Sequence, residues 1–185
     1  LGLIGLFLVW QLWLLGWVLL WKWVDPGTTR FMEIRLSELR EKNPDARLKK
    51  QWVAYEQISP HLKRAIIASE DARFVDHEGF DWDGIQKAME KNQKRGRTVA
   101  GGSTISQQLA KNLYLSPSKN PVRKIKEAIL TWRMERNLSK RRIMELYLNV
   151  AEWGDGVFGI EAAARKHYGK SAAALGPREA AVLAS

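Results

Sequence analysis

The sequence predicts a mainly α-helical protein, with one globular domain behind an apolar N-terminal segment. Three observations support this prediction. Apolar residues recur at helical spacing along most of the chain, residues that favour helix caps precede several of these stretches, and patterns typical of β-strands are few. With 185 residues, the chain is long enough to bury a hydrophobic core.

The composition indicates which partners the protein can bind. The formal net charge is +10, which favours anionic partners such as phosphate groups, acidic lipids or nucleic acid. The chain contains no cysteine, so disulfide frameworks and thiolate metal sites are excluded.

The N-terminal residues 1–23 are apolar apart from Gln11 and Lys22. About 20 apolar residues cross a bilayer as a helix, whereas a cleaved signal peptide has an apolar core of about 7–15 residues and an A-x-A cleavage site. No alanine occurs before Ala46, so we expect a retained transmembrane anchor over residues 1–24. A linker and membrane-proximal segment over residues 25–51 and the globular domain over residues 52–185 should follow, and we expect both ends to continue in a longer protein.

The linker opens with turn chemistry at Asp25-Pro26-Gly27. Residues 28–43 suggest a short strand and then a helix, and residues 49–58 suggest an extended entry into the next helix. That helix is expected to begin with Ser59 as its cap and Pro60 in its first turn.

The stretch from Ile66 to Asp81 joins the end of this helix to an acidic loop. Leu62, Ala65 and Ile66 follow helical spacing, so the helix has a buried face and Glu70 lies near its end. A carboxylate where apolar surface meets a polar loop is expected to be partly shielded from water, which suits it to act as a general base. The alternative is an acidic loop that merely ends a helix.

A further helix is expected over residues 82–92, with Ile85, Ala88 and Met89 on one face, and a basic mobile loop over residues 93–98. Gly96 and Gly101 have the spacing of the glycines in a phosphate-binding P-loop. The P-loop needs lysine directly after the second glycine, and Gly102 stands there, which disfavours an NTPase.

The stretch from Gly101 to Asn112 is expected to open a helix with a capping box formed by Thr104 and Gln107. Its apolar face carries Ile105, Leu109 and Leu113. A helix start behind two glycines offers free N–H groups to an anion, and Gln108 and Lys111 add a neutral donor and a cation. The alternative is an ordinary capped helix with a polar face.

The next helix is expected to be capped by Asn120-Pro121, to run to about Arg136, and to bury a stripe of Val122, Ile125, Ile129 and Trp132. Arg123, Lys124 and Glu127 are spaced to cluster on one side. They could provide two cations for a diphosphate, held by a carboxylate. The alternative is a surface ion-pair helix worth a few tenths of a kcal/mol.

The remainder of the chain continues the helical pattern. Ser139 is expected to start a helix with Asn149 near its end and a core face made by Ile143, Leu146, Tyr147 and Val150. A turn-rich loop over residues 152–156 precedes a helix that stops at Gly169, and Pro177 starts a last apolar helix.

Four of these stretches resemble the motifs of the peptidoglycan glycosyltransferase family. The motif E-D-x-x-F-x-x-H-x-G-x-D matches residues 70–81, and G-G-S-T-x-x-Q-Q-x-x-K-N matches residues 101–112. R-K-x-x-E matches residues 123–127, and R-I-x-E-x-Y-L-N matches residues 142–149. The resemblance covers roughly Trp52 to the end of the sequence. Because no second large domain is present, the chain is similar to the monofunctional enzyme rather than to bifunctional penicillin-binding proteins.

The resemblance implies a lysozyme-like helical domain with a small membrane-facing subdomain, outside the cytoplasmic (inner) membrane and held there by a single-pass anchor. It implies polymerisation of lipid II into glycan strands. The GlcNAc 4-hydroxyl of lipid II would attack, with inversion, C1 of a MurNAc that carries undecaprenyl diphosphate. By resemblance Glu70 is the general base, and Glu127 supports catalysis by holding the cations or a divalent metal.

The resemblance also implies a set of substrate-binding residues: Asp71, Phe74, His77, Ser103, Thr104, Gln107, Gln108, Lys111, Asn112, Arg123, Lys124 and Asn149. Of these, Asp71, Phe74 and His77 are expected to shape the first motif. No cofactor is obligatory, although Mg²⁺ or Mn²⁺ could take part. The expected partners are the growing lipid-linked glycan, the bilayer, moenomycin-type inhibitors and other cell-wall synthesis proteins.

Two other functions compete with this interpretation. A glycan-cleaving muramidase also uses two carboxylates, but it needs neither diphosphate-binding cations nor a membrane segment. A membrane-tethered nucleic-acid binder would suit the net charge of +10. However, its basic residues would be interleaved with exposed aromatic residues, and that pattern is not found here.

Overall fold

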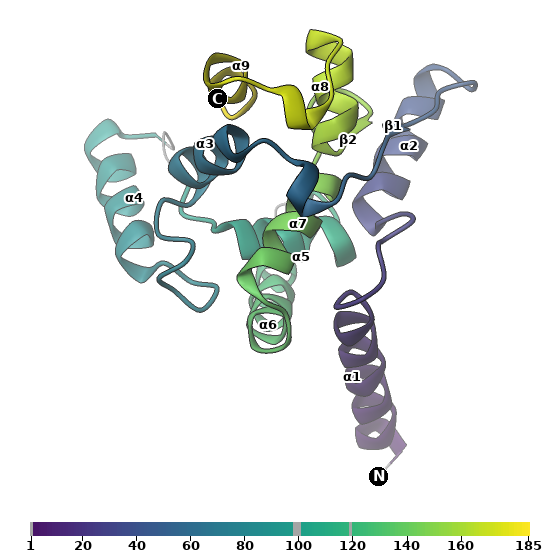
Figure 1. Cartoon of the computed structure of the whole chain (residues 1–185). Coiled ribbons are helices and arrows are strands. Elements are labelled where there is room, and N and C mark those ends of the chain that lie inside the picture. The colour runs from purple at the N-terminus through teal and green to yellow at the C-terminus, as the bar shows by residue number, and fades with distance from the viewer. Residues whose placement is uncertain (1, 98–100, 119) are drawn as a thin grey trace.

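The computed structural model describes residues 2–97, 101–118 and 120–185, and its architecture is mainly helical, as predicted (Figure 1). The helices are α1 (Gly2–Leu20), α2 (Arg30–Lys42), α3 (Pro60–Glu70), α4 (Trp82–Arg95), α5 (Ile105–Tyr114), α6 (Pro121–Asn137), α7 (Lys140–Val150), α8 (Ile160–Tyr168) and α9 (Pro177–Leu183). Two short strands, β1 (Lys49–Lys50) and β2 (Val157–Phe158), pair in parallel. Single 3-10 turns lie at Tyr55–Gln57 and Ala172–Ala174.

Helices α5 and α7 form the centre of the hydrophobic core. Helix α5 packs against α2, α6 and α7, and it buries the predicted face of Ile105, Leu109 and Leu113. Helix α7 buries its predicted face as well, made by Ile143, Leu146, Tyr147 and Val150. Each fully buried leucine or isoleucine contributes roughly 1.5–3 kcal/mol, so these two helices are a firm support for side chains at their edges.

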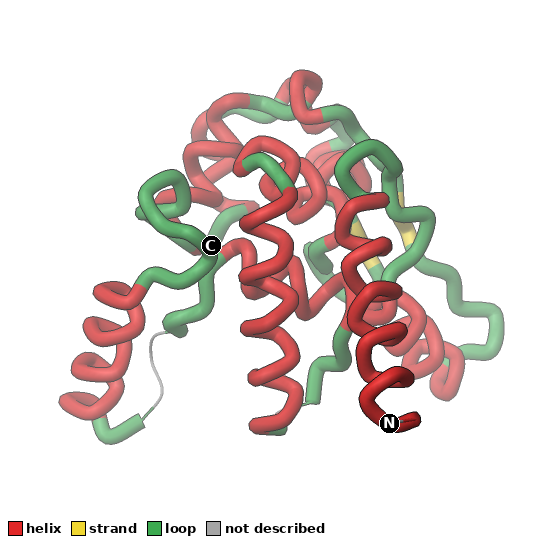
Figure 2. The backbone as a smooth tube through the Cα atoms, turned by 90° about the horizontal axis from the view of Figure 1, so that it is seen from below, coloured by secondary structure: helices red, strands yellow, loops and turns green. Residues whose placement is uncertain are grey.

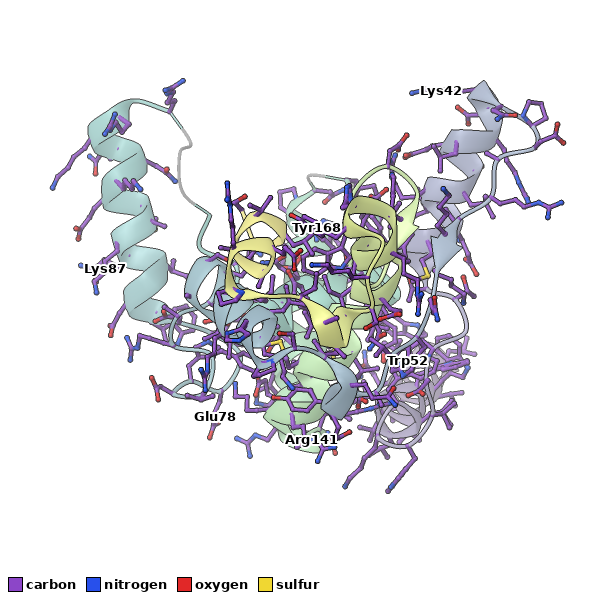
Figure 3. All side chains as sticks on the ribbon, turned by 45° about the horizontal axis from the view of Figure 1, so that its top comes forward. Lys42, Trp52, Glu78, Lys87, Arg141 and Tyr168 are labelled. Carbon is purple, nitrogen blue, oxygen red and sulfur yellow. The ribbon has the colours of Figure 1, made fainter. Side chains whose placement is uncertain are left out.

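Helices α4 and α2 extend on opposite sides of this centre, while α8 and α9 lie at the end of the molecule opposite α1 (Figures 1 and 2). Charged side chains point away from the core on both arms, as Lys87 of α4 and Lys42 of α2 show (Figure 3). Helix α4 buries Ala88 but leaves 66% of Met89 exposed, so the predicted apolar face of this helix was only partly right.

The connections differ from the prediction in two places. Residues 93–95 still belong to α4, which ends at Gly96 in the left-handed conformation (φ 62°), and Thr98 of the predicted mobile loop lies outside the described residues. The short strand predicted within residues 28–43 is absent from that fully described segment. Instead, the Thr29 hydroxyl accepts a hydrogen bond from the Met32 N–H and caps α2.

The helix caps follow the sequence closely, with one exception. Thr104 and Gln107 form the predicted capping box of α5, and Asn120 and Ser139 cap α6 and α7. Ser59 precedes α3, with Pro60 in the first turn as predicted, but its hydroxyl donates to the Leu175 carbonyl (2.7 Å) instead of capping the helix. That prediction was wrong because a tertiary partner before α9 competes for the hydroxyl.

Helix α1 is attached to the domain by two arginine side chains. Arg133 of α6 donates to the backbone carbonyl (3.3 Å) and side-chain oxygen of Gln11, and Arg142 of α7 donates to the Trp21 (2.7 Å) and Val24 (2.9 Å) carbonyls. None of the helices in the described part of the chain combines the length and the hydropathy that a membrane span needs. The membrane-spanning anchor over residues 1–24 therefore stays a prediction.

Helix α6 is rotated away from the prediction. Its apolar stripe faces outward, with exposed fractions of 57% for Val122, 62% for Ile125, 45% for Ile129 and 52% for Trp132. The buried residues are Glu127, Leu130, Thr131 and Met134. The predicted buried stripe was wrong because periodicity identifies residues that share a face but not which face meets the domain.

Candidate active site

Glu70 is the last residue of α3 and lies at the edge of a cavity of about 610 Å³. Its side chain is exposed, which differs from the partial shielding expected from the sequence. One carboxylate oxygen accepts a hydrogen bond from the side-chain amide of Gln108 on α5 (2.7 Å). Glu70 is therefore open to a substrate and oriented by a neutral donor.

Tyr147 of α7 stands behind this contact. Its hydroxyl donates to the side-chain oxygen of Gln108 (3.3 Å), so the Gln108 amide nitrogen faces Glu70. Burial raises the pKa of the Tyr147 phenol, and the nearby negative charge of Glu70 raises it further. The phenol thus keeps its proton and remains a donor at neutral pH. Sequence reasoning assigned Tyr147 to the core and missed this role, although the residue stands in a matched motif.

The loop after α3 is tied to the start of α5. The Gly79 N–H donates to Nδ1 of His77 (3.1 Å), so Nε2 carries the ring hydrogen and donates to Asp71 (2.9 Å). The second oxygen of the buried Asp71 accepts from the Ile105 N–H (3.0 Å), and Thr104 donates to the Gly79 carbonyl (2.7 Å). These contacts fix the end of α3 against the start of α5.

Further residues support the same loop. Phe74 is buried with its ring edge-on to His77, and Lys140 of α7 lies over the Phe74 ring and donates to the His77 carbonyl (2.5 Å). Lys140 also pairs with Glu135 (2.8 Å). Asp71, Phe74, His77, Thr104 and Gln107 are thus engaged in shaping the site, and direct substrate contact by them stays a prediction.

Two cationic side chains of α6 gather around a buried carboxylate of the same helix. Glu127 is only 2% exposed, and its two carboxylate oxygens pair separately with Arg123 and Lys124. Lys124 also donates to the Ser103 hydroxyl (3.1 Å), just before α5. A buried carboxylate needs such partners, because an unpaired one would cost several kcal/mol. Glu127 therefore holds two cations beside the start of α5.

Lys111 of α5 connects this cluster with Glu70. Burial is the main cause that lowers the pKa of Lys111, and the positive charges of Arg123 and Lys124 lower it further. The negative charges of Glu127 and Glu70 act in the opposite direction. Lys111 is thus within electrostatic reach of both groups. We define the cationic cluster as Lys111, Arg123 and Lys124 around Glu127.

Asn149 and Asn112 are two further predicted binding residues that are buried. Asn149 donates to the Val53 carbonyl (2.9 Å) and accepts from the Val53 N–H (2.8 Å), so its amide joins α7 to the segment before α3. It also donates to the Glu145 carbonyl (2.9 Å). Asn112 is buried on α5. Their contact with a substrate stays a prediction.

The cavity beside Glu70 is completed by parts of the chain that the sequence did not single out. Gln108 and Tyr147 line one side, and residues 151–154, His167 and the C-terminal residues 182–185 line the other. No sequence pattern marks the second side, because only tertiary packing brings α8 and α9 to α3.

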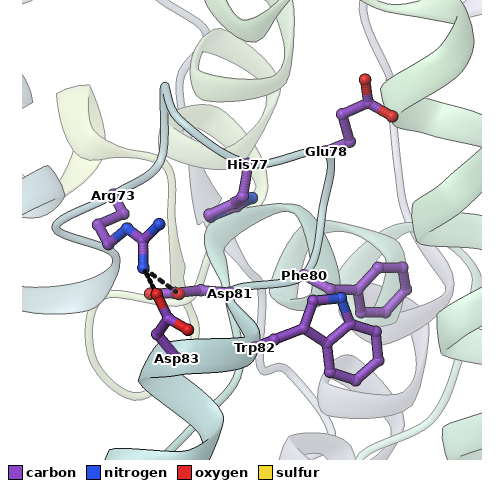
Figure 4. Close-up of a pocket in the computed structure, with 7 residues that line it drawn as sticks. All are labelled: Arg73, His77, Glu78, Phe80, Asp81, Trp82 and Asp83. Carbon is purple, nitrogen blue, oxygen red and sulfur yellow. Dashed lines mark hydrogen bonds and ion pairs between the residues drawn. The ribbon is translucent and has the colours of Figure 1, made fainter.

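A second, smaller cleft of about 400 Å³ lies on the loop between α3 and α4 (Figure 4). Arg73 pairs there with Asp81 and Asp83, and Phe80 stacks on Trp82. Asp81 also caps α4 by accepting from the Gly84 N–H (3.0 Å). Glu70 lines the cavity of about 610 Å³ and not this cleft, so we take the former as the candidate active site.

The described residues 2–97, 101–118 and 120–185 contain no group of three or more histidine, cysteine, aspartate or glutamate residues arranged to hold a metal ion. Both oxygens of Glu127 are already paired with cations. Among the described residues, Glu127 is thus the partner of two cations, and a role for the divalent metal that the resemblance allows stays a prediction.

Comparison with known proteins gives consistent matches. A transglycosylase family model matches residues 36–185. The chain is 74% identical to a biosynthetic peptidoglycan transglycosylase of Dechloromonas aromatica (strain RCB) over 184 residues, which are 100% of this chain and 80% of the relative. It is 62% identical to a protein of the same name from Azoarcus sp. (strain BH72), over 97% of this chain and 78% of the relative. The same name applies to a relative from Laribacter hongkongensis (strain HLHK9), 58% identical over 100% of this chain and 81% of the relative.

Proposed function

This chain belongs to the transglycosylase family and is a peptidoglycan transglycosylase, and from that premise we propose that it polymerises lipid II into glycan strands with Glu70 as general base. The acceptor is lipid II with its GlcNAc 4-hydroxyl. The donor is the growing glycan, whose terminal MurNAc carries a lipid diphosphate at C1.

The observation that carries this proposal is the position of α5 between the proposed general base and the cations of α6. Gln108 touches Glu70, while Lys111, three residues later on the same helix face, is in electrostatic reach of Arg123 and Lys124. Helix α5 thus touches the proton acceptor of α3 through Gln108 and contributes Lys111 to the cations that α6 supplies. Glycosyl transfer from a diphosphate requires this combination.

The reaction proceeds as one displacement. Glu70 takes the proton of the 4-hydroxyl as its oxygen attacks C1, the new C–O bond forms with inversion, and the bond from C1 to the phosphate oxygen breaks. The electron pair leaves with the lipid diphosphate, whose negative charge Lys111, Arg123 and Lys124 stabilise. Removing one such preorganised charge partner typically costs about 10²–10³ in kcat.

The supporting residues act before the chemical step. Gln108 holds the Glu70 carboxylate through its amide (2.7 Å), and Glu127 keeps Arg123 and Lys124 in place. The His77–Asp71 hydrogen bond (2.9 Å) orders the loop after Glu70, and the second Asp71 oxygen ties this loop to α5 by accepting from the Ile105 N–H (3.0 Å). Ser103 and Asn112 are proposed to position sugar or phosphate groups.

The enzyme is proposed to work at the outer face of the cytoplasmic membrane, where both of its lipid-linked substrates reside. The apolar helix α1, with exposed Leu6, Leu12 and Trp13, supports attachment to a bilayer. Moenomycin-type inhibitors are proposed to occupy the cationic cluster. A lysozyme-like fold, a spanning anchor, metal dependence and cell-wall protein partners stay predictions from the resemblance.

The alternative function is glycan cleavage by a muramidase. No specific observation favours it, because hydrolysis of a glycan has no use for cations assembled around a buried Glu127.

The test is a product assay with the full chain in vesicles. We expect polymer from fluorescent lipid II and no fragments from preformed glycan. Glu70→Gln keeps the shape of the side chain but cannot take a proton, and loss of a positioned base typically costs about 10²–10⁴ in rate. Glu78→Gln, an exposed carboxylate in the loop after α3, is the matched control. Fragments instead of polymer, or near-normal polymerisation by Glu70→Gln, would overturn the proposal.

A further inference from the structure

The loop that follows α7, residues 152–156, forms part of the wall of the cavity beside Glu70. Glu152, Trp153 and Gly154 line this cavity together with Gln108. In the proposed reaction Glu70 takes a proton and Gln108 orients it, whereas the loop has no task yet. A substrate that enters the cavity nevertheless meets the loop, so the contacts that fix its shape bear on how the substrate lies.

The loop has a backbone shape that needs support. Gly154 (φ 126°) and Gly156 (φ 69°) both have a positive φ, which favours glycine. Two backbone hydrogen bonds close the base of the loop: the Trp153 N–H donates to the Val157 carbonyl (2.8 Å), and the Val157 N–H donates to the Gly154 carbonyl (2.9 Å). Because glycine permits many other conformations, the segment between these bonds depends on side-chain contacts to keep one shape.

Arg35 of α2 supplies these contacts from outside the cavity. Its Nε donates to both carboxylate oxygens of Glu152 (3.2 and 3.1 Å), and Nη2 donates to Asp155 (2.7 Å). Its Nη1 pairs with Glu38 of the same helix. Glu152 in turn accepts from the Gly156 N–H (3.1 Å). One planar guanidinium thus bridges two carboxylates of the loop, a geometry for which arginine is suited and lysine is not.

Helix α2 is a firm support for this arginine. Met32 is only 2% exposed, and the helix packs against α5. Phe31 meets the ring of Phe158 in β2 edge-on, with 6.4 Å between the ring centroids. Leu39 lies so close to the loop that a Cβ added to Gly156 would be 3.0 Å from its Cδ1. Helix α2 therefore contacts both the loop and the strand that follows it.

We propose that Arg35 is a positioning residue for the glycosyl transfer. By holding Glu152 and Asp155, it fixes the loop over residues 152–156 so that this wall keeps the acceptor sugar in place against Glu70. Arg35 is not among the residues that line the cavity, so it acts through the loop. The inference rests on the proposed function in one respect, namely that the GlcNAc of lipid II enters this cavity. A displacement of reacting groups by about 1 Å can cost about 10²-fold in rate.

The competing explanation is an ion pair that merely stabilises the fold. An example of an ordinary surface pair is present on the same helix, where Arg30 and Glu33 (3.3 Å) have side chains that are 61% and 52% exposed. The contacts of Arg35 differ from this pair. They reach residues 117 and 120 positions later in the sequence, and both of these residues belong to the loop beside Glu70.

The experiment compares Arg35→Gln and Arg35→Lys with Arg30→Gln, each in the full chain in vesicles. Arg30→Gln is the matched control, because it removes a guanidinium of the same helix whose pair with Glu33 does not reach the loop. Initial rates with lipid II give kcat and KM. Hydrogen exchange followed by mass spectrometry reports the order of residues 152–157. Melting temperatures and the affinity of a moenomycin-type inhibitor show whether the rest of the domain is intact.

We expect Arg35→Gln to speed amide exchange at residues 152–157 and to lower kcat/KM about 10–100-fold, with a raised KM for lipid II. Melting temperature and inhibitor affinity should stay near wild type, since the cationic cluster lies on α5 and α6 and not on the loop. Arg35→Lys keeps the charge and can still pair with Glu152, so it should recover part of the loss. Arg30→Gln should match the wild type in every measurement.

Four results would overturn the proposal. Unchanged exchange in Arg35→Gln means that Arg35 does not hold the loop, and faster exchange with wild-type kcat/KM means that the reaction does not need an ordered wall. A lower kcat with an unchanged KM points to fewer folded molecules. No recovery in Arg35→Lys means that pairing with Glu152 does not position the loop. If Glu70→Gln still polymerises, the proposed function fails, whereas loop exchange still reports on Arg35, so the two failures are distinguishable.

Discussion

Tyr147→Phe tests whether the donor chain behind Glu70 contributes to catalysis. The substitution keeps the aromatic ring in the core and removes only the hydroxyl that donates to Gln108 (3.3 Å). A neutral hydrogen bond contributes about 0.5–1.5 kcal/mol net, and 1.36 kcal/mol corresponds to about tenfold in rate. We therefore expect kcat to fall about 2–10-fold, because the Gln108 amide is then free to turn away from Glu70.

The assay compares initial rates of lipid II polymerisation at several substrate concentrations. KM should change little, since the substitution keeps the buried ring that lines the cavity and removes only a hydroxyl that is bonded to Gln108. Tyr114→Phe is the matched control: Tyr114 lies at the end of α5, burial raises its pKa as well, and it lines the groove beside α1 rather than the Glu70 cavity. Both variants should have similar melting temperatures.

Two results would refute this reasoning. If Tyr147→Phe polymerises at the wild-type rate, Gln108 does not depend on the phenol for its orientation. If both tyrosine variants lose the same activity, the loss reflects core packing and not the path from Tyr147 to Glu70.

Three other predictions follow from the same site. Replacing Arg123 and Lys124 together by glutamine should weaken binding of a moenomycin-type inhibitor at least tenfold in calorimetry, and unchanged affinity in the folded variant would contradict their role as anion ligands. Because burial lowers the pKa of Lys111, activity should fall as the pH rises through this lowered value. Lys111→Arg should move the basic limb of the pH–rate profile to higher pH, because arginine keeps its proton. If the limb does not move, another group is responsible for the titration. The full chain should stay with membranes during alkaline carbonate extraction, and its appearance in the supernatant would contradict stable attachment through residues 1–24.

Local features of the fold could be predicted from the sequence because they depend on neighbours along the chain. The capping box of Thr104 and Gln107, the caps at Asn120 and Ser139 and the end of α8 at Gly169 involve residues a few positions apart. The resemblance to the family's motifs predicted the roles of Glu70 and the cationic residues. Helix periodicity alone could not distinguish a functional site there from an ordinary polar surface.

Features that depend on tertiary contacts could not be predicted in the same way. The hydroxyl of Ser59 was available to cap α3, yet Leu175, 116 positions later, accepts its hydrogen bond. The exposure of Glu70 depends on how α9 packs against α3 and how Gln108 of α5 meets the end of that helix, and no pattern within residues 60–81 reports it. Tyr147 has the spacing of a core residue and is one, but its hydroxyl reaches Gln108 on a different helix.

The wrong prediction for α6 is informative because one rotation of the helix about its axis both buries Glu127 and exposes the apolar stripe. Residues two positions apart on an α-helix are separated by about 200°, so Ile125 and Ile129 both point nearly opposite to Glu127. Turning the stripe into the core would bring Glu127 and its two cations out into water and away from Lys111. A helix that buries a carboxylate and exposes isoleucine and tryptophan contradicts the usual preference of these side chains, and such contradictions concentrate where function requires them. The rotation that assembles the cationic cluster is therefore the same one that turns the apolar side chains of α6 outward.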